Sequence, residues 1–181
     1  MKAAEIAEFV RNVEPLPPNP PYGPRYRVSA SLTDGTLLPC VVIQGTDPTV
    51  DLAIKRFDET RKSRDPFMGY RNIVKAFVAQ GNTVNDDDIA TLAPSPHAIP
   101  LARMREIGGE TSMSWTEFYA RMKDGKEFRF GTTFLTEFFA MPAGYTANDI
   151  VRITPAVRGE VPRQEAIHRE RPSFTCYVDG L

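Results

Sequence analysis

The sequence predicts a β-rich α+β fold in which two related small β units pack together beside two helices. Three observations support this prediction: two hairpin signals built on Asp-Gly, two similar stretches containing Asp-Ile, and two segments with helical periodicity. Asp-Gly favours the tight primed turns of hairpins because such turns need a positive φ. These segments are the hairpins at 25–44 and 114–134, the stretches NDDDIATLAP (85–94) and TANDIVRITP (146–155), and the helices at 3–13 and 48–62.

Composition is that of an ordinary soluble globular protein. The chain has 181 residues, of which 41% are hydrophobic and 25% charged, and its net charge is −1. This balance argues against a dedicated nucleic-acid binder, which usually carries a positive excess. The sequence has no apolar run of the roughly 20 residues that span a bilayer. Because acids at Glu5, Glu8 and Glu14 interrupt the first segment, it is not a secretory signal, and we expect a cytoplasmic protein without membrane contact.

A helix and a proline-rich strap are expected to form the first segment, residues 1–24. Ile6, Phe9, Val10 and Val13 fall on one face of a helix over 3–13. The stretch PLPPNPPYGP that follows holds six prolines in ten residues. Proline fixes φ and lacks an amide donor, so this strap should be extended.

The first β unit is expected at 25–95, with an inserted helix at 48–62. Alternation of apolar and polar residues predicts a strand before the Asp34-Gly35 turn and a return strand after it. Pro39 in the return strand indicates an edge position or a bulge. Asp47 and Pro48 are typical of a helix start, and the segment 70–81 is predicted to be a further strand.

The second β unit is expected at 114–157, after a connector at 96–113 that contains a predicted strand from Ile99 to Ile107. Its hairpin turns at Asp124-Gly125 and faces Phe118, Ala120 and Met122 against Phe128 and Phe130. The remaining segment, 158–181, is charged at first and ends in the strand SFTCYV.

The two halves repeat one pattern: an Asp-Gly hairpin, then a polar cluster that starts a short strand, then a proline that ends it. Pro ends such a strand because it offers no ladder donor. This order resembles the small, strongly bent β-barrels of the SH3-like and Sm-like kind. The likeness is one of architecture and points to no particular family, and it suggests an internal duplication.

Chemistry-bearing residues form no recognised motif. The Cys and His residues are Cys40, His97, His168 and Cys176, and none of these has the close spacing of a zinc site. Two cysteines among apolar neighbours predict buried thiols rather than a disulfide framework. The run Asp86–Asp88 reads as a turn, because the glycine and distal glutamate of a calcium loop are missing. The sequence also lacks a phosphate-binding loop, and we therefore predict neither a metal nor a cofactor.

An aromatic-rich stretch is the favoured interaction surface. Residues 128–145 hold more large rings than a small barrel needs for its core, so some are expected at an interface. We therefore predict a non-enzymatic binding or assembly module that contacts a protein partner or its own copy as a homo-oligomer. The predicted partner-binding residues are Phe134, Phe138, Phe139 and Tyr145.

Two other functions stay open. Nucleic acid could bind the basic segment 55–71, where backbone contacts would make affinity fall with salt. The predicted residues there are Lys55, Arg56, Arg61, Lys62, Arg64 and Arg71. Alternatively, the protein is a small enzyme whose site is assembled around a histidine, His97 or His168, as the acid–base group.

Overall fold

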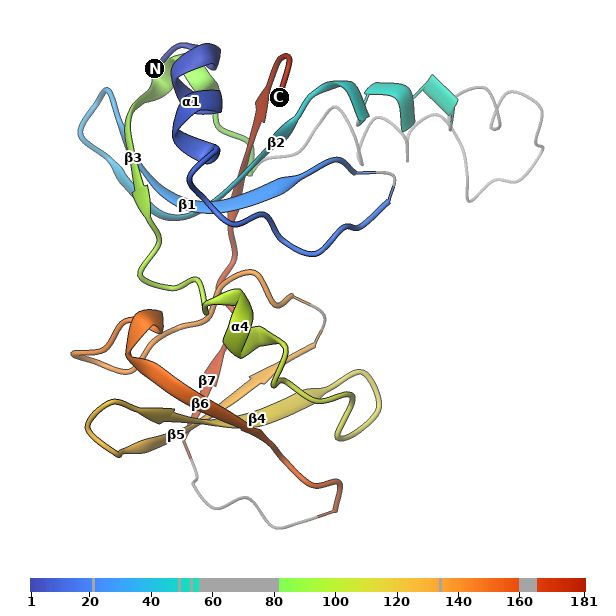
Figure 1. Ribbon diagram of the computed structural model, residues 1–181, viewed down its shortest axis with the longest axis vertical. Coiled ribbons are helices and arrows are strands. Elements are labelled where there is room, and N and C mark those ends of the chain that lie inside the picture. The colour runs from blue at the N-terminus through green and yellow to red at the C-terminus, as the bar shows by residue number, and fades with distance from the viewer. Residues whose placement is uncertain (21, 49, 53, 56–81, 134, 160–165) are drawn as a thin grey trace. The chain divides into compact units, whose positions relative to one another are not determined.

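Two compact units make up the chain in the computed structural model (Figure 1), which describes residues 1–20, 22–48, 50–52, 54–55, 82–133, 135–159 and 166–181. Unit 1 comprises Met1–Leu92 together with Phe174–Leu181, and unit 2 comprises Ala93–Ser173. Each unit holds one four-stranded sheet. The predicted α+β class with few helices is confirmed. None of the described helices is long and apolar enough to cross a bilayer.

The sheet of unit 1 has the strand order β3-β1-β2-β8. The hairpin pairs β1 with β2 in antiparallel fashion, and β8 adds to β2 in parallel. Gly35 takes a φ of 88° at the predicted turn, and the Asp34 carboxylate accepts the Thr36 amide at 2.8 Å. The strands are β1 (Arg25–Leu32), β2 (Leu37–Gly45), β3 (Ile89–Pro94) and β8 (Phe174–Val178), with the one-turn helix η2 (Asp86–Asp88) before β3.

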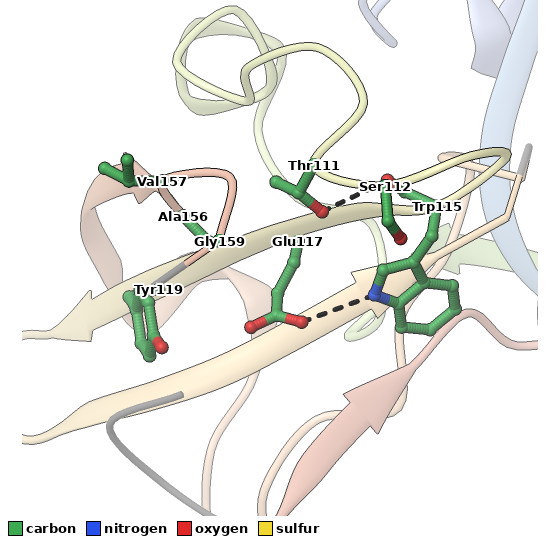
Figure 2. A pocket seen from close by; sticks show the side chains of 8 residues that line it. All are labelled: Thr111, Ser112, Trp115, Glu117, Tyr119, Ala156, Val157 and Gly159. Atoms are coloured by element: carbon green, nitrogen blue, oxygen red, sulfur yellow. Dashed lines mark hydrogen bonds between the residues drawn. The ribbon is translucent and has the colours of Figure 1, made fainter. Parts of the chain in front are cut away.

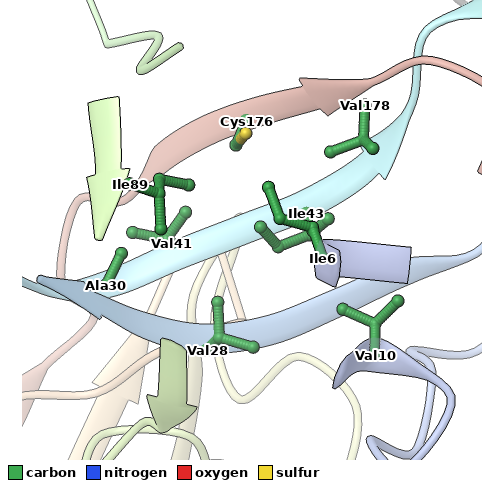
Figure 3. Close-up of a cluster of buried hydrophobic side chains, with 9 residues drawn as sticks. All are labelled: Ile6, Val10, Val28, Ala30, Val41, Ile43, Ile89, Cys176 and Val178. Atoms are coloured by element: carbon green, nitrogen blue, oxygen red, sulfur yellow. The ribbon is translucent and has the colours of Figure 1, made fainter. Parts of the chain in front are cut away.

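The core of unit 1 lies between this sheet and helix α1 (Ala3–Val10), as Figure 3 shows. Ile6 and Val10, one turn apart, are fully buried against the sheet. The helix is shorter than the predicted 3–13: it ends at Val10, after which the amides of Asn12 and Val13 donate to carbonyls three residues back in a tighter turn. The buried cluster is Ile6, Val10, Val28, Ala30, Val41, Ile43, Ile89, Cys176 and Val178.

The sheet of unit 2 has the order β6-β4-β5-β7, again an antiparallel hairpin with a parallel strand added to its second member. Gly125 takes a φ of 89° at the turn, so both predicted hairpins are confirmed. The elements are α4 (Leu101–Met104), β4 (Thr116–Met122), β5 (Glu127–Thr132), the one-turn helix η3 (Ala147–Asp149), β6 (Ile150–Pro155) and β7 (Ile167–Arg169).

Aromatic rings dominate the core of unit 2. The rings of Phe118 and Phe130 stack with centroids 5.4 Å apart, and Phe139 meets both edge-on. Such offset and edge-on geometries suit the ring quadrupoles. The buried cluster is Ile99, Phe118, Ala120, Met122, Phe130, Phe139, Ala147, Ile150 and Ile153.

The two predicted Asp-Ile stretches occupy matching places. Each forms a one-turn helix followed by an edge strand that ends at proline. Each also accepts a backbone hydrogen bond from the hairpin turn: Thr33 N–H to Asp88 O at 2.8 Å, and Lys123 N–H to Asp149 O at 2.9 Å. Over the described residues, however, neither sheet closes into a barrel.

Three segments differ from the prediction or extend beyond the described residues. The connector forms α4 and not a strand over Ile99–Ile107, because the Pro100 carbonyl accepts the first helical bonds from Arg103 and Met104. Pro39 lies where the β1–β2 register shifts, which confirms a bulge, but β2 is an interior strand because β8 pairs with it from Val41 onward. The described residues of 47–55 are helical, while the rest of the inserted helix and the strand predicted at 70–81 lie outside the described residues.

Candidate functional site

Polar and aromatic side chains gather on the face of the unit 2 sheet that lies opposite its aromatic core. Successive residues of a strand point to opposite faces, so Glu117 and Tyr119 share a face while Phe118 points inward. The register sets Arg129 opposite Tyr119 and Gly131 opposite Glu117 on the neighbouring strand. This outer face is therefore built by β4 and β5 together.

A buried ion pair forms the floor of this face. The Arg129 guanidinium donates to both carboxylate oxygens of Glu117, from Nε at 2.6 Å and from a terminal nitrogen at 2.8 Å. The two side chains are only 14% and 11% exposed. These hydrogen bonds hold the pKa of the Glu117 carboxyl below its usual range, and the carboxylate raises the pKa of Arg129. The pair is therefore rigid, and its positive and negative charges offset each other.

Trp115 is fixed beside this pair on three sides. Its indole Nε1–H donates to Glu117 at 3.3 Å, and the Arg169 guanidinium lies 5.0 Å from the ring centroid. Beneath the ring lies Gly131, where a Cβ would overlap the indole and come within 2.7 Å of Ile167 Cδ1. A glycine inside a strand often marks such a close approach. The glycine in FRFGTTF was the sequence signal for this site, and sequence reasoning missed it.

A hollow of about 170 Å³ opens over these residues (Figure 2). Figure 2 shows Glu117 between Tyr119 and Trp115. The loop at one rim is a tight turn, closed by Trp115 N–H to Ser112 O at 3.0 Å, in which Ser114 takes a φ of 58° and Met113 is 90% exposed. The lining residues are Thr111, Ser112, Trp115, Glu117, Tyr119, Ala156, Val157 and Gly159.

The chemistry of the hollow suits binding better than catalysis. Its carboxylate is already held by Arg129, so it is a poor general base. The lining residues carry hydroxyl groups but include neither a histidine nor a cysteine. In the part of the chain that the structure describes, no group of three or more His, Cys, Asp or Glu residues could hold a metal ion.

The predicted partner-binding residues lie elsewhere in unit 2. Phe138 and Phe139 are fully buried, and Phe139 belongs to the aromatic core. Tyr145 is half-buried and its hydroxyl donates to Asp124 at 2.6 Å, while Phe134 lies outside the described residues. The partner-binding role of this stretch stays a prediction, and Phe138 and Phe139 have no exposed surface in this fold with which to fulfil it.

Of the predicted nucleic-acid-binding residues, the structure describes Lys55, which is exposed. The others, Arg56, Arg61, Lys62, Arg64 and Arg71, lie outside the described residues. The structure therefore leaves this alternative as a prediction.

The histidines and cysteines are engaged in structure. His97 uses both ring nitrogens, one with the Phe139 carbonyl and one with Arg171, each at 3.0 Å. His168 packs its ring against Phe128 and Phe130. Cys40 and Cys176 are buried and form no disulfide, and burial raises the pKa of the Cys176 thiol to about 12.

Comparisons of the chain with protein-family models, with curated proteins and with solved structures found no match.

Proposed function

We propose that the protein is a non-enzymatic binding module, and that unit 2 recognises a protein partner by taking one of its side chains into the hollow over Trp115 and Glu117. The observation that carries this proposal is the fixed geometry of the hollow. An indole and a phenol line it, and a buried ion pair holds its floor in place. A site organised before binding loses little entropy when its partner arrives.

The residue types at the hollow support a protein partner. Tryptophan, tyrosine and arginine are enriched among the residues that dominate interface energies. Met113 and Val157 leave 90% and 59% of their surface exposed on the loops that contribute to the rim. Apolar groups around an anchored aromatic residue are typical of interfaces. The hollow is smaller than the roughly 300 Å³ at which drug-sized pockets begin, so a single side chain is the fitting occupant.

The test uses the fluorescence of Trp115, the single tryptophan of the chain. Displayed random peptides are selected on the immobilised protein, and enriched peptides are then titrated while the emission of Trp115 is followed. We expect binding to alter this emission and to weaken at least about tenfold in Val157→Lys, a cost near 1.4 kcal/mol. The matched control is Val151→Lys, because Val151 is similarly exposed but lies on β6 outside the hollow.

A second copy of the chain is the alternative occupant, and light scattering distinguishes it. A dimer that persists at high salt and is lost in Val157→Lys would identify the partner as the protein itself. Peptides that bind Val157→Lys as well as the unaltered protein, or selection that yields no peptide above background, would contradict the proposed site.

The repeated architecture supports a finer proposal about the fold, namely that both units descend from one duplicated small-barrel unit. Strand order, turn position, the one-turn helix and its hydrogen bond to the turn all agree. In unit 1 the bridge between Thr83 and Thr175 adds a fifth short segment beside β8, and η2 joins that segment to β3 at the opposite edge. In unit 2 the bridge between Phe139 and Glu170 lies likewise beside β7, although it is antiparallel where the first is parallel.

A crystal structure tests this finer proposal. Hairpins, one-turn helices and edge strands that superpose element for element would support duplication. Different registers at the two edge strands would contradict it.

A further inference from the structure

His97 is held in a single neutral form by its two partners. The Phe139 carbonyl, 3.0 Å from Nδ1, can only accept a hydrogen bond. The Arg171 guanidinium, 3.0 Å from Nε2, can only donate one. The proton of the neutral ring must therefore lie on Nδ1, and Nε2 must be bare.

Backbone hydrogen bonds complete this cluster into a seam of three segments. Phe139 N–H donates to His97 O at 3.0 Å, and Arg171 N–H donates to Phe138 O at 2.9 Å. The segment that contains Phe138 and Phe139 is therefore hydrogen-bonded on one side to the segment of His97 and on the other to the segment of Arg171. The His97–Arg171 bond then joins these two outer segments directly.

The two outer segments lie, along the chain, next to the two points at which it passes from one unit to the other. The chain leaves unit 1 for unit 2 between Leu92 and Ala93, and it returns between Ser173 and Phe174. His97 follows the first crossing closely and Arg171 precedes the second. Both connections between the units are therefore tied together, within unit 2, by one histidine and one arginine.

We propose that His97 and Arg171 form a proton-operated clamp that holds these two connecting segments together at neutral pH and releases them on acidification. A proton on Nε2 would remove the acceptor that Arg171 uses and place an N–H group against an N–H group. It would also set two positive charges in contact, and a like charge nearby disfavours the protonated ring.

No carboxylate is among the groups that shift the pKa of His97. Its pKa is lowered first by burial and then by the charge of Arg171, while the bond to the Phe139 carbonyl opposes this. Glu170, on the same segment as Arg171, accepts from Thr133 instead. The hydroxyl of Ser95 accepts the backbone amide of His97 and not the ring. Glu137, which directly precedes Phe138, is not among the groups that shift the pKa of His97.

The direction of the pH effect follows from this lowered pKa. The free ring has a pKa of 6.5, so the clamp contributes fully above that pH and is lost as the pH falls toward the value in the closed state. Between these two values, opening should increase about tenfold for each pH unit. Acid therefore opens the clamp, and alkali leaves it closed.

Amide hydrogen exchange on the full chain tests the clamp. We expect the protection factors of the Phe139 and Arg171 amides, corrected for the intrinsic effect of pH, to fall about tenfold per pH unit between pH 6.5 and the pKa of the closed state, and to level off below it. In His97→Gln the side-chain oxygen can still accept from Arg171 but cannot titrate, so this pH dependence should vanish. His168→Gln is the matched control and should keep it, because the His168 ring packs against Phe128 and Phe130 and Arg171 is not among the groups that shift its pKa.

Nitrogen chemical shifts of the His97 ring in the unaltered protein provide a measurement that depends on no variant. A bare Nε2 at neutral pH and a ring pKa below 6.5 would support the clamp. A proton on Nε2 at neutral pH, a ring pKa at or above 6.5, or unchanged pH dependence of exchange in His97→Gln would overturn it.

Discussion

Individual side chains on the outer face of unit 2 are interlocked, so each one sets the position of the next. Gly131 leaves room for the indole of Trp115, Trp115 donates to Glu117, and Glu117 holds Arg129. Arg169 lies over the remaining face of the indole. Because the floor is an ion pair and not a free charge, the hollow can be rigid without a strong preference for ligands of either charge.

Removing the carboxylate should damage this arrangement strongly. In Glu117→Ala, Arg129 stays largely buried and loses both of its hydrogen bonds to the Glu117 carboxylate, and we expect the free energy of unfolding of unit 2 to fall by about 3 kcal/mol. Urea denaturation followed through Trp115 fluorescence measures this change. Lys123→Ala is the control within the same unit, because the Lys123–Asp149 pair is more exposed and its loss should cost less than about 1 kcal/mol. Equal losses in both variants would contradict this ranking.

The sequence could predict part of this site and not the rest. Alternation along β4 places Glu117 and Tyr119 on the face away from the phenylalanines, and this was readable. The pairing of Glu117 with Arg129 depends on the hairpin register, which brings residues twelve apart together. The many aromatic residues at 128–145 suggested that some rings, among them Phe138 and Phe139, would be exposed at an interface. Both of these side chains are fully buried instead.

At the scale of elements, the edge strand β6 is closed by a side chain of the connector. The Glu106 carboxylate accepts the Ile153 amide at 2.7 Å. In the sheet, Ile153 lies opposite Ala120 on β4, and its amide is turned to the outer edge to reach Glu106. An open strand edge invites pairing with another chain, so this carboxylate removes one donor that a foreign strand would need.

Loss of this carboxylate should open the edge locally. In Glu106→Ala we expect faster hydrogen exchange at the Ile153 amide and a stability loss of about 1.5 kcal/mol, as for one hydrogen bond to a charged group. Glu110→Ala, on the exposed part of the same connector, should change neither quantity. An Ile153 amide that stays as protected in Glu106→Ala as in the unaltered protein would show that Glu106 does not guard the edge.

Elements with a strong local cause were predictable, and elements with a distant cause were not. Asp34-Gly35 and Asp124-Gly125 fix their turns because glycine adopts a positive φ there, and the Asp-Gly dipeptide alone predicts such a turn. The short helix α4 replaced a predicted strand because Pro100 starts a turn whose Ile99 and Leu101 side chains are buried in unit 2. The parallel additions of β7 and β8 had no signal in their own sequences, since pairing partners more than a hundred residues away decide the addition of β8.

At the scale of the whole molecule, the segment 167–178 supplies a strand to each unit. It adds β7 to β5 in unit 2, and after the second crossing it adds β8 to β2 in unit 1. Val178 on β8 is fully buried in the unit 1 core, whereas Phe174 on the same strand is 38% exposed. The two units thus depend on neighbouring parts of one segment.

A charge placed at Val178 should separate the stabilities of the two units. Val178→Asp buries a carboxylate without a partner, at a cost of about 3 kcal/mol or more. We expect unit 1 to lose protection against hydrogen exchange, while Trp115 emission from unit 2 is unchanged. Phe174→Asp should leave both units folded. Simultaneous loss of both units in Val178→Asp would mean that they fold as one cooperative body.

The division of unit 1 into two pieces has a consequence for synthesis on the ribosome. The ribosome makes α1, β1 and β2 before unit 2, but it makes β8 only after the whole of unit 2. Unit 2 therefore receives its last strand before unit 1 does, although unit 1 was started first. Until then β2 carries an open edge in the nascent chain, and open edges are sites of misassembly. Unit 1, which is begun first, is therefore completed last, and a chaperone that shields the β2 edge during translation should raise the yield of folded protein.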